Sequence, residues 1–152
     1  KWGINQIRGG YVSVFMHQKM MCHDANYAVL GVQEHIRIFG APPKDFGFDR
    51  AGWSAEHMKE IKNLGVKNLA IAPKGQAEWK VSQRVKNRMI VERAQIEGKI
   101  GTMKRRGLNK SEARLSSRVR LSALRAGLSL NLRRFARDLA MAGMMQNVNA
   151  GM

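Results

Sequence analysis

The chain has 152 residues, enough for one domain with a hydrophobic core, and its single cysteine, Cys22, excludes an intramolecular disulfide framework. Against 11 Asp and Glu it carries 27 Lys and Arg, a net charge of +16. The excess is uneven, because residues 1–80 hold 11 basic and 7 acidic residues while residues 81–152 hold 16 and 4. No apolar run reaches the roughly 18 residues of a membrane span, so we expect no membrane partner. Such a charge indicates a polyanionic partner, with nucleic acid foremost.

The N-terminal residues predict a β-hairpin. Residues 11–17 are rich in β-branched and aromatic side chains, and the preceding Gly9 and Gly10 suit a hairpin turn from residues 1–8. The chain begins with Lys1, in a segment that already has the character of a strand. We therefore expect a fragment whose N-terminal part is missing.

Helices and strands alternate over the next part of the chain. The apolar spacing predicts a helix over 24–39, a short strand over 44–49, a helix over 54–64 and a short strand over 68–72. Glycine, proline or a capping serine stands at the predicted boundaries. Strands that alternate with helices predict an α/β fold, a mixed sheet flanked by helices.

A long basic helix is predicted over residues 84–106. Its apolar stripe has spacings of seven, four and three residues, formed by Met89, Ile96, Ile100 and Met103. Glu97 falls at the edge of this stripe, and small residues surround it. One interpretation is an amphipathic core helix with a solvated glutamate. The other is that a nucleic-acid backbone or a metal-bound phosphate approaches closely there, because glycines in a helix interior are costly.

The C-terminal part predicts basic helices. A turn at 107–109 is followed by Ser111, a candidate N-cap, and we expect the last helix to fray from Gly143. Its apolar residues recur at spacings of three and four, at positions 121, 124, 128, 132, 135 and 139. The charge excess here comes from arginines, namely Arg114, Arg118, Arg120, Arg125, Arg133, Arg134 and Arg137.

Two carboxylates are candidate metal ligands. Asp49 stands at the C-terminal end of a predicted strand, where α/β sheets place ligand-binding groups, and it precedes Glu97 by 48 residues. Mg²⁺ takes few protein carboxylates and keeps positions for water and phosphate oxygens, so the pair could hold one. The alternative is that Asp49 caps a turn. Trp53 and Trp79 could stack on a base, although core packing is the simpler expectation.

Three stretches of the sequence resemble the DDE transposases of bacterial insertion sequences. The first, Asp49 to Ser54, resembles the family's Asp-Arg-x-Gly-aromatic-Ser motif after a strand. The second, Arg93 to Lys104, resembles the helix motif Arg-Ala-x-x-Glu-Gly-x-Ile-Gly-x-x-Lys, with Glu97 as its acid. The third, Asn131 to Phe135, resembles the family's Asn-Leu-x-x-Leu/Phe ending. The likeness runs in order from about residue 40 to residue 140.

The resemblance implies an RNase H-like catalytic domain that cleaves and transfers DNA strands. In this family Asp, Asp and Glu hold two Mg²⁺ or Mn²⁺ ions; Asp49 matches the second Asp and Glu97 the Glu. Water frees a DNA 3′ end, whose hydroxyl then attacks target DNA. The implied partners are the element ends and target DNA, with a homodimer for the full-length protein in the bacterial cytoplasm at the nucleoid. The residues assigned to DNA phosphates are Arg93, Lys104, Arg105 and Arg106.

The sequence departs from the family pattern in one respect. The family's first Asp belongs on a first strand that would precede residue 1, and Asp24, Asp45 and Asp138 sit in other elements. We therefore expect residues 1–108 to form a partial RNase H-like core and residues 109–152 to form basic helices packed on it. The fragment is expected to be inactive alone. The alternative is a non-catalytic basic module that binds DNA or RNA.

Overall fold

The described residues form four strands and four α-helices, in the order that the sequence predicts. The computed structural model describes residues 2–16, 23–72, 79–105 and 116–150. Its elements are β1 (Trp2–Gln6), η1 (Arg8–Gly10), β2 (Val12–Met16), α1 (Asp24–Phe39), β3 (Asp45–Phe48), η2 (Arg50–Gly52), α2 (Ala55–Asn63), β4 (Asn68–Ile71), α3 (Gln83–Met103) and α4 (Ser116–Ala150), where η1 and η2 are short 3-10 turns. The chain is therefore a mixed α/β protein, with helices predominating.

The strands form two separate sheets within the described residues, whereas the sequence predicted one mixed sheet. β1 pairs antiparallel with β2, with Trp2 opposite Met16, and β3 pairs parallel with β4, with Asp45 opposite Asn68. No ladder of backbone hydrogen bonds joins these two sheets in the described part of the chain. Each pair can form by itself, because a tight turn closes the hairpin and the α2 crossover closes the parallel pair.

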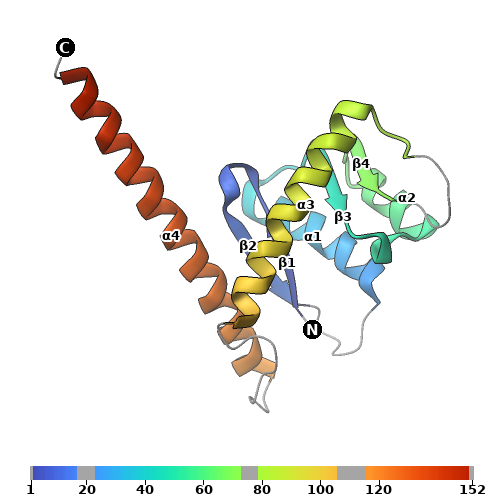
Figure 1. Ribbon diagram of the computed structural model, residues 1–152. Helices are drawn as coiled ribbons and strands as arrows, with labels where there is room; N and C mark the ends of the chain where they lie inside the picture. The colour runs from blue at the N-terminus through green and yellow to red at the C-terminus, as the bar shows by residue number, and fades with distance from the viewer. Residues whose placement is uncertain (1, 17–22, 73–78, 106–115, 151–152) are drawn as a thin grey trace.

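Two helices hold the sheets together. α1 contacts both strands of the hairpin and also packs on α2, while α3 crosses β1, β3 and β4 (Figure 1). The first hydrophobic core lies between α1, α2 and the parallel sheet, and Trp53 packs at its margin as expected. Its buried members are Ala28, Val29, Val32, Phe46, Ile61, Val66, Leu69 and Ile71.

The first half of α4 packs on β2. The Asn131 side-chain amide forms both backbone hydrogen bonds that a neighbouring strand would form with Val12. Its Oδ1 accepts from the Val12 N–H at 2.8 Å, and its Nδ2 donates to the Val12 carbonyl at 2.8 Å. Further along α4, the Tyr11 hydroxyl donates to Asp138 Oδ2 at 2.9 Å, and this hydrogen bond raises the pKa of Tyr11. The second core, formed by Val14, Met103 and Ala123, joins β2, α3 and α4. α4 is thus anchored along one side only.

α4 continues past Gly143, where we expected fraying to begin, as far as Ala150. A glycine costs a helix about 1 kcal/mol, which a helix of this length can absorb when helix-forming residues follow it. The second half of α4 projects away from the rest of the molecule (Figure 1). None of the described helices combines the length and the hydropathy that a membrane crossing requires.

Candidate functional site

The alternation of side chains along β3 directs its odd-numbered residues toward α3. Phe46 belongs to the first core, so Asp45 and Gly47 face the other way. Asp45 forms an ion pair with Arg88 of α3, and a Cβ on Gly47 would lie 2.8 Å from Met89 Sδ of the same helix. Glycine at this position therefore lets α3 approach β3 closely. The extended backbone of Asp49, directly after the strand, continues the same alternation.

Arg93 joins the two candidate metal ligands. Its Nη2 lies 3.1 Å from Asp49 Oδ1, at the end of β3. Its Nε lies 3.1 Å from Glu97 Oε1, one turn further along α3. The sequence predicted that Asp49 and Glu97 face one groove and that Arg93 contacts phosphate. In the structure, the Arg93 guanidinium contacts both carboxylates, although Asp49 and Glu97 are 48 residues apart along the chain.

The separation of the two carboxylates follows from this geometry. The two nitrogens belong to one rigid planar group, so Asp49 Oδ1 and Glu97 Oε1 lie no more than roughly 8–9 Å apart. A pair that bridges metal ions is separated by about 4–8 Å, since metal–oxygen bonds are near 2.1 Å. The carboxylate oxygens suit a hard divalent cation, but Arg93 already pairs with both groups. A metal ion would have to displace it.

Asp49 also has the structural role that the sequence left open. Its Oδ1 accepts a hydrogen bond from the Arg50 N–H at 2.6 Å and so caps the η2 turn. Capping uses the same oxygen as the ion pair to Arg93. The turn therefore fixes the direction of the carboxylate, so the two roles are compatible.

The candidate site is open, and no third carboxylate joins it among the residues that the structure describes. The side chains of Arg93, Asp49 and Glu97 are 50%, 59% and 62% exposed. Within the described residues, no group of three or more His, Cys, Asp or Glu side chains is placed to hold a metal ion. The site as it stands is a pair of solvated carboxylates bridged by a cation. By itself it would hold a divalent ion weakly, because most of the ligands would have to be water or phosphate.

The other predicted DNA-binding residues follow the carboxylate pair along α3. Lys104 comes seven residues after Glu97, about 10 Å further along the same face, and is exposed. Arg105 is exposed as well, and its Nη2 donates to Thr102 Oγ1 at 3.3 Å. Arg106 lies outside the described residues. The exposed cations of this helix thus lie beside the carboxylates.

Glycines near Glu97 leave open space on α3. A Cβ on Gly98 would meet nothing within 4 Å, and one on Gly101 would meet only the Arg105 guanidinium, at 3.8 Å. Contacts among the described residues therefore do not explain why either position is a glycine. This agrees with the interpretation that something outside the chain approaches α3 here.

Sequence reasoning missed Lys86. This residue precedes Arg93 by seven positions and so lies on the same face of α3. Its Nζ sits 5.6 Å from the centre of the Trp79 ring, a cation–π contact that places a flat aromatic group beside the row of cations. The seven-residue spacing from Lys86 to Arg93 was the available signal. We define the basic ridge as the side chains on this face, Lys86, Arg93 and Lys104, with Arg105 beside them.

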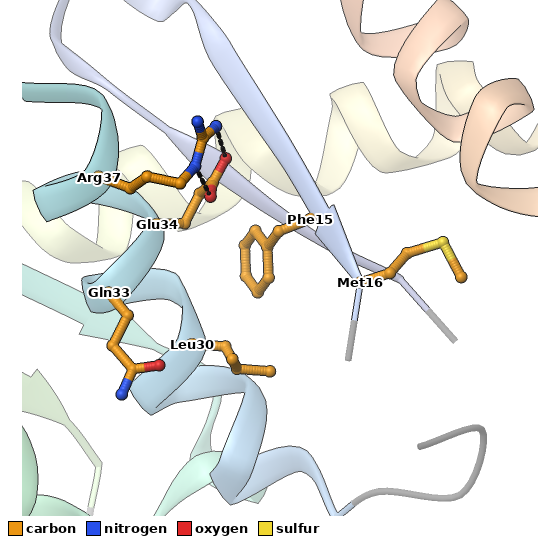
Figure 2. A pocket seen from close by; sticks show the side chains of 6 residues that line it. All are labelled: Phe15, Met16, Leu30, Gln33, Glu34 and Arg37. Atoms are coloured by element: carbon orange, nitrogen blue, oxygen red, sulfur yellow. Dashed lines mark hydrogen bonds and ion pairs between the residues drawn. The ribbon is translucent and has the colours of Figure 1, made fainter. Parts of the chain in front are cut away.

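A shallow pocket elsewhere is no competing site. It has a volume of about 220 Å³ and lies where β2 meets α1, lined by Phe15, Met16, Leu30, Gln33, Glu34 and Arg37 (Figure 2). The Glu34 carboxylate and the Arg37 guanidinium on its rim bind each other through two contacts of 2.8 and 2.9 Å. Nothing in its lining points to a ligand.

Comparison of the chain with protein-family models, with curated proteins and with solved structures finds no match. The resemblance to DDE transposases rests on the three motif stretches.

Proposed function

We propose that this chain is part of the RNase H-like catalytic domain of a DDE transposase, which hydrolyses and transfers DNA phosphodiester bonds with two Mg²⁺ or Mn²⁺ ions. The observation that carries the proposal is the convergence of Asp49 and Glu97 on one guanidinium. These two residues are the acids of the motifs that resemble the family. An incidental likeness in two distant stretches gives no reason for their acids to meet at one point.

The candidate residues would have separate roles as metal ligands and as phosphate contacts. Asp49 and Glu97 would supply carboxylate oxygens to the metal ions. Bound divalent ions supply activation of the attacking oxygen and stabilisation of the leaving oxygen at phosphorus. Arg93, once displaced from the carboxylates, would remain beside them and contact a phosphate. Lys104, Arg105 and Arg106 would hold the DNA backbone without reading its sequence.

The remaining expectations belong to the same proposal. The parent protein would act on the ends of its element and on target DNA, as a homodimer, at the nucleoid in the bacterial cytoplasm. These 152 residues alone are expected not to cleave DNA, because two carboxylates of the implied three bind metal poorly. Metal-dependent nicking by this chain would contradict that expectation.

The test measures DNA affinity with Mn²⁺ and with a chelator, for the unmodified chain and for the double variant Asp49→Asn with Glu97→Gln. A transposase core predicts that Mn²⁺ strengthens DNA binding by the unmodified chain, because the ion joins carboxylates to phosphate. The double variant should lose this response and bind DNA more tightly in chelator, since two negative charges are gone. Glu60→Gln removes an exposed carboxylate on α2 and should keep the response.

The alternative function is a non-catalytic basic module that binds DNA or RNA. The observation in its favour is that Arg93 already pairs with both carboxylates and that the other cations of the basic ridge lie on the same face of α3. This function predicts the same gain in affinity for the double variant with and without Mn²⁺. An unmodified chain whose DNA affinity ignores Mn²⁺ would therefore support the binding module and reject the transposase site.

A further inference from the structure

α4 carries an exposed stripe of large apolar side chains. Its six members, which we call the α4 stripe, are Leu121, Leu124, Leu128, Leu132, Phe135 and Leu139, and each is between 44% and 58% exposed. Their spacings are three, four, four, three and four residues. At about 100° per residue, the six lie within about 80° of one another around the helix axis. The stripe is therefore straight and narrow over five turns.

The α4 stripe is separate from the side of α4 that packs on β2. The residues that make that contact include Ala123, which is fully buried, and Gly127, whose added Cβ would lie 2.6 Å from Val14 Cγ2. Asn131 completes it through its two hydrogen bonds to β2. These positions point on average about 100° away from the stripe. The two sides of the helix can thus be occupied at once.

The size of the stripe favours a protein partner. Six large side chains that are half exposed present on the order of 500 Å² of apolar surface, at the upper end of what soluble monomers leave uncovered. Two copies facing each other would bury about 1,000 Å², the lower limit for a specific interface. A stripe this narrow is typical of the seam between two paired helices, whereas a helix lying on a membrane or on a globular core has a broader apolar face.

The charges beside the stripe select the orientation of a second copy. Arg118, Arg120 and Arg125 flank its N-terminal half, each about 60–80° from the middle of the stripe. At the same angles its C-terminal half carries Ala136 and Asp138 and no arginine. In a parallel pair the arginines of one copy would face the same arginines of the other, which is unfavourable. In an antiparallel pair they would face the half that has no flanking arginine.

We propose that α4 pairs with α4 of a second copy of this chain in antiparallel orientation, through the α4 stripe. Leu128 lies across from Leu132 of the other copy, Leu124 from Phe135, and Leu121 from Leu139. The inference rests on α4 alone, so its failure would leave the proposed transposase function untouched.

The first test is the oligomeric state of the whole chain in sedimentation experiments, freed of nucleic acid. We expect a dimer that dissociates on dilution and that strengthens with added salt, because salt screens the repulsion between two strongly positive copies. DNA binding would weaken under the same change. The double variant Leu128→Gln with Leu132→Gln should be monomeric yet folded, since both side chains are 58% exposed. The matched control, Ile90→Gln with Val91→Gln on α3, should remain dimeric.

The second test fixes the orientation by disulfide cross-linking in a Cys22→Ser background. Leu124→Cys combined with Phe135→Cys should give a cross-linked dimer, and Leu124→Cys alone should give none. Cross-linking by the single variant would show a parallel pair and overturn the proposed orientation. A chain that is monomeric at every concentration, or that pairs only on DNA, would overturn the interface. If the unmodified chain is monomeric and binds anionic vesicles, and the Leu128/Leu132 double variant does not bind them, the stripe would be assigned to a membrane surface instead.

Discussion

Replacing Arg93 with methionine separates the two roles of the candidate site. Methionine keeps the length and the helix propensity of arginine but removes the guanidinium from between Asp49 and Glu97. The two ion pairs are at 3.1 Å, between side chains that are at least half exposed. Such pairs contribute about 0.5 kcal/mol each, so the variant should lose at most about 1 kcal/mol of stability.

The same free energy sets the expected gain in metal affinity. In the unmodified chain a divalent ion that binds both carboxylates must first displace Arg93, which costs about 1 kcal/mol and weakens its binding about fivefold. Removing the positive charge of Arg93 also removes its repulsion of the metal ion, which raises the expected gain in metal affinity toward tenfold. Arg93→Met should therefore bind Mn²⁺ about five to ten times more tightly.

The assay is a Mn²⁺ titration followed by electron paramagnetic resonance, which reports the concentration of free Mn²⁺ directly. Arg84→Met is the matched control, because it removes an exposed arginine from the first turn of the same helix. Its Mn²⁺ affinity should stay within about twofold of the unmodified chain, since screening leaves distant exposed charges little effect. If Arg93→Met gains no more affinity than Arg84→Met, Arg93 does not compete with metal at Asp49 and Glu97, and the reasoning is refuted.

Three further predictions concern stability. Gly127→Ala should lower the free energy of urea unfolding by about 1–2 kcal/mol, because the new methyl group meets a β2 valine. Gly98→Ala, where the new methyl group meets nothing, should raise it by up to about 1 kcal/mol. Equal effects of the two substitutions would contradict the packing. Asn131→Ala should cost about 1–3 kcal/mol and speed hydrogen exchange of the Val12 amide, whose partner is lost; unchanged exchange would contradict this. Partial burial alone would raise the pKa of Asp45, but hydrogen bonds from its neighbours on β4 and α3 outweigh it and lower that pKa. Asp45 therefore stabilises the fold above its ordinary pKa of about 4 and less as the pH falls further, so the gap in urea midpoint between the unmodified chain and Asp45→Asn should close in acid; a constant gap would refute the assignment.

The sequence alone determined the order of the elements and the face of α3 that is buried. Short apolar runs between glycines and prolines predicted β3 and β4, and the spacing of Met89, Ile96, Ile100 and Met103 predicted the inward side of α3, where Met103 is fully buried. These features depend on local periodicity, which is read directly from residue order. Gly143 does not end α4, because one glycine is a weak stop signal within a long helix.

Only the tertiary structure decided how the strands group and what surrounds the carboxylates. The split into two sheets depends on which strand edges meet, and local sequence carries no information about that. Likewise, the spacing of 48 residues between Asp49 and Glu97 says nothing about distance. Their convergence on Arg93 follows from the packing of α3 across β3, which Gly47 permits. The exposure of the α4 stripe is a tertiary result as well, because an apolar spacing predicts a contact face without showing whether this chain covers it.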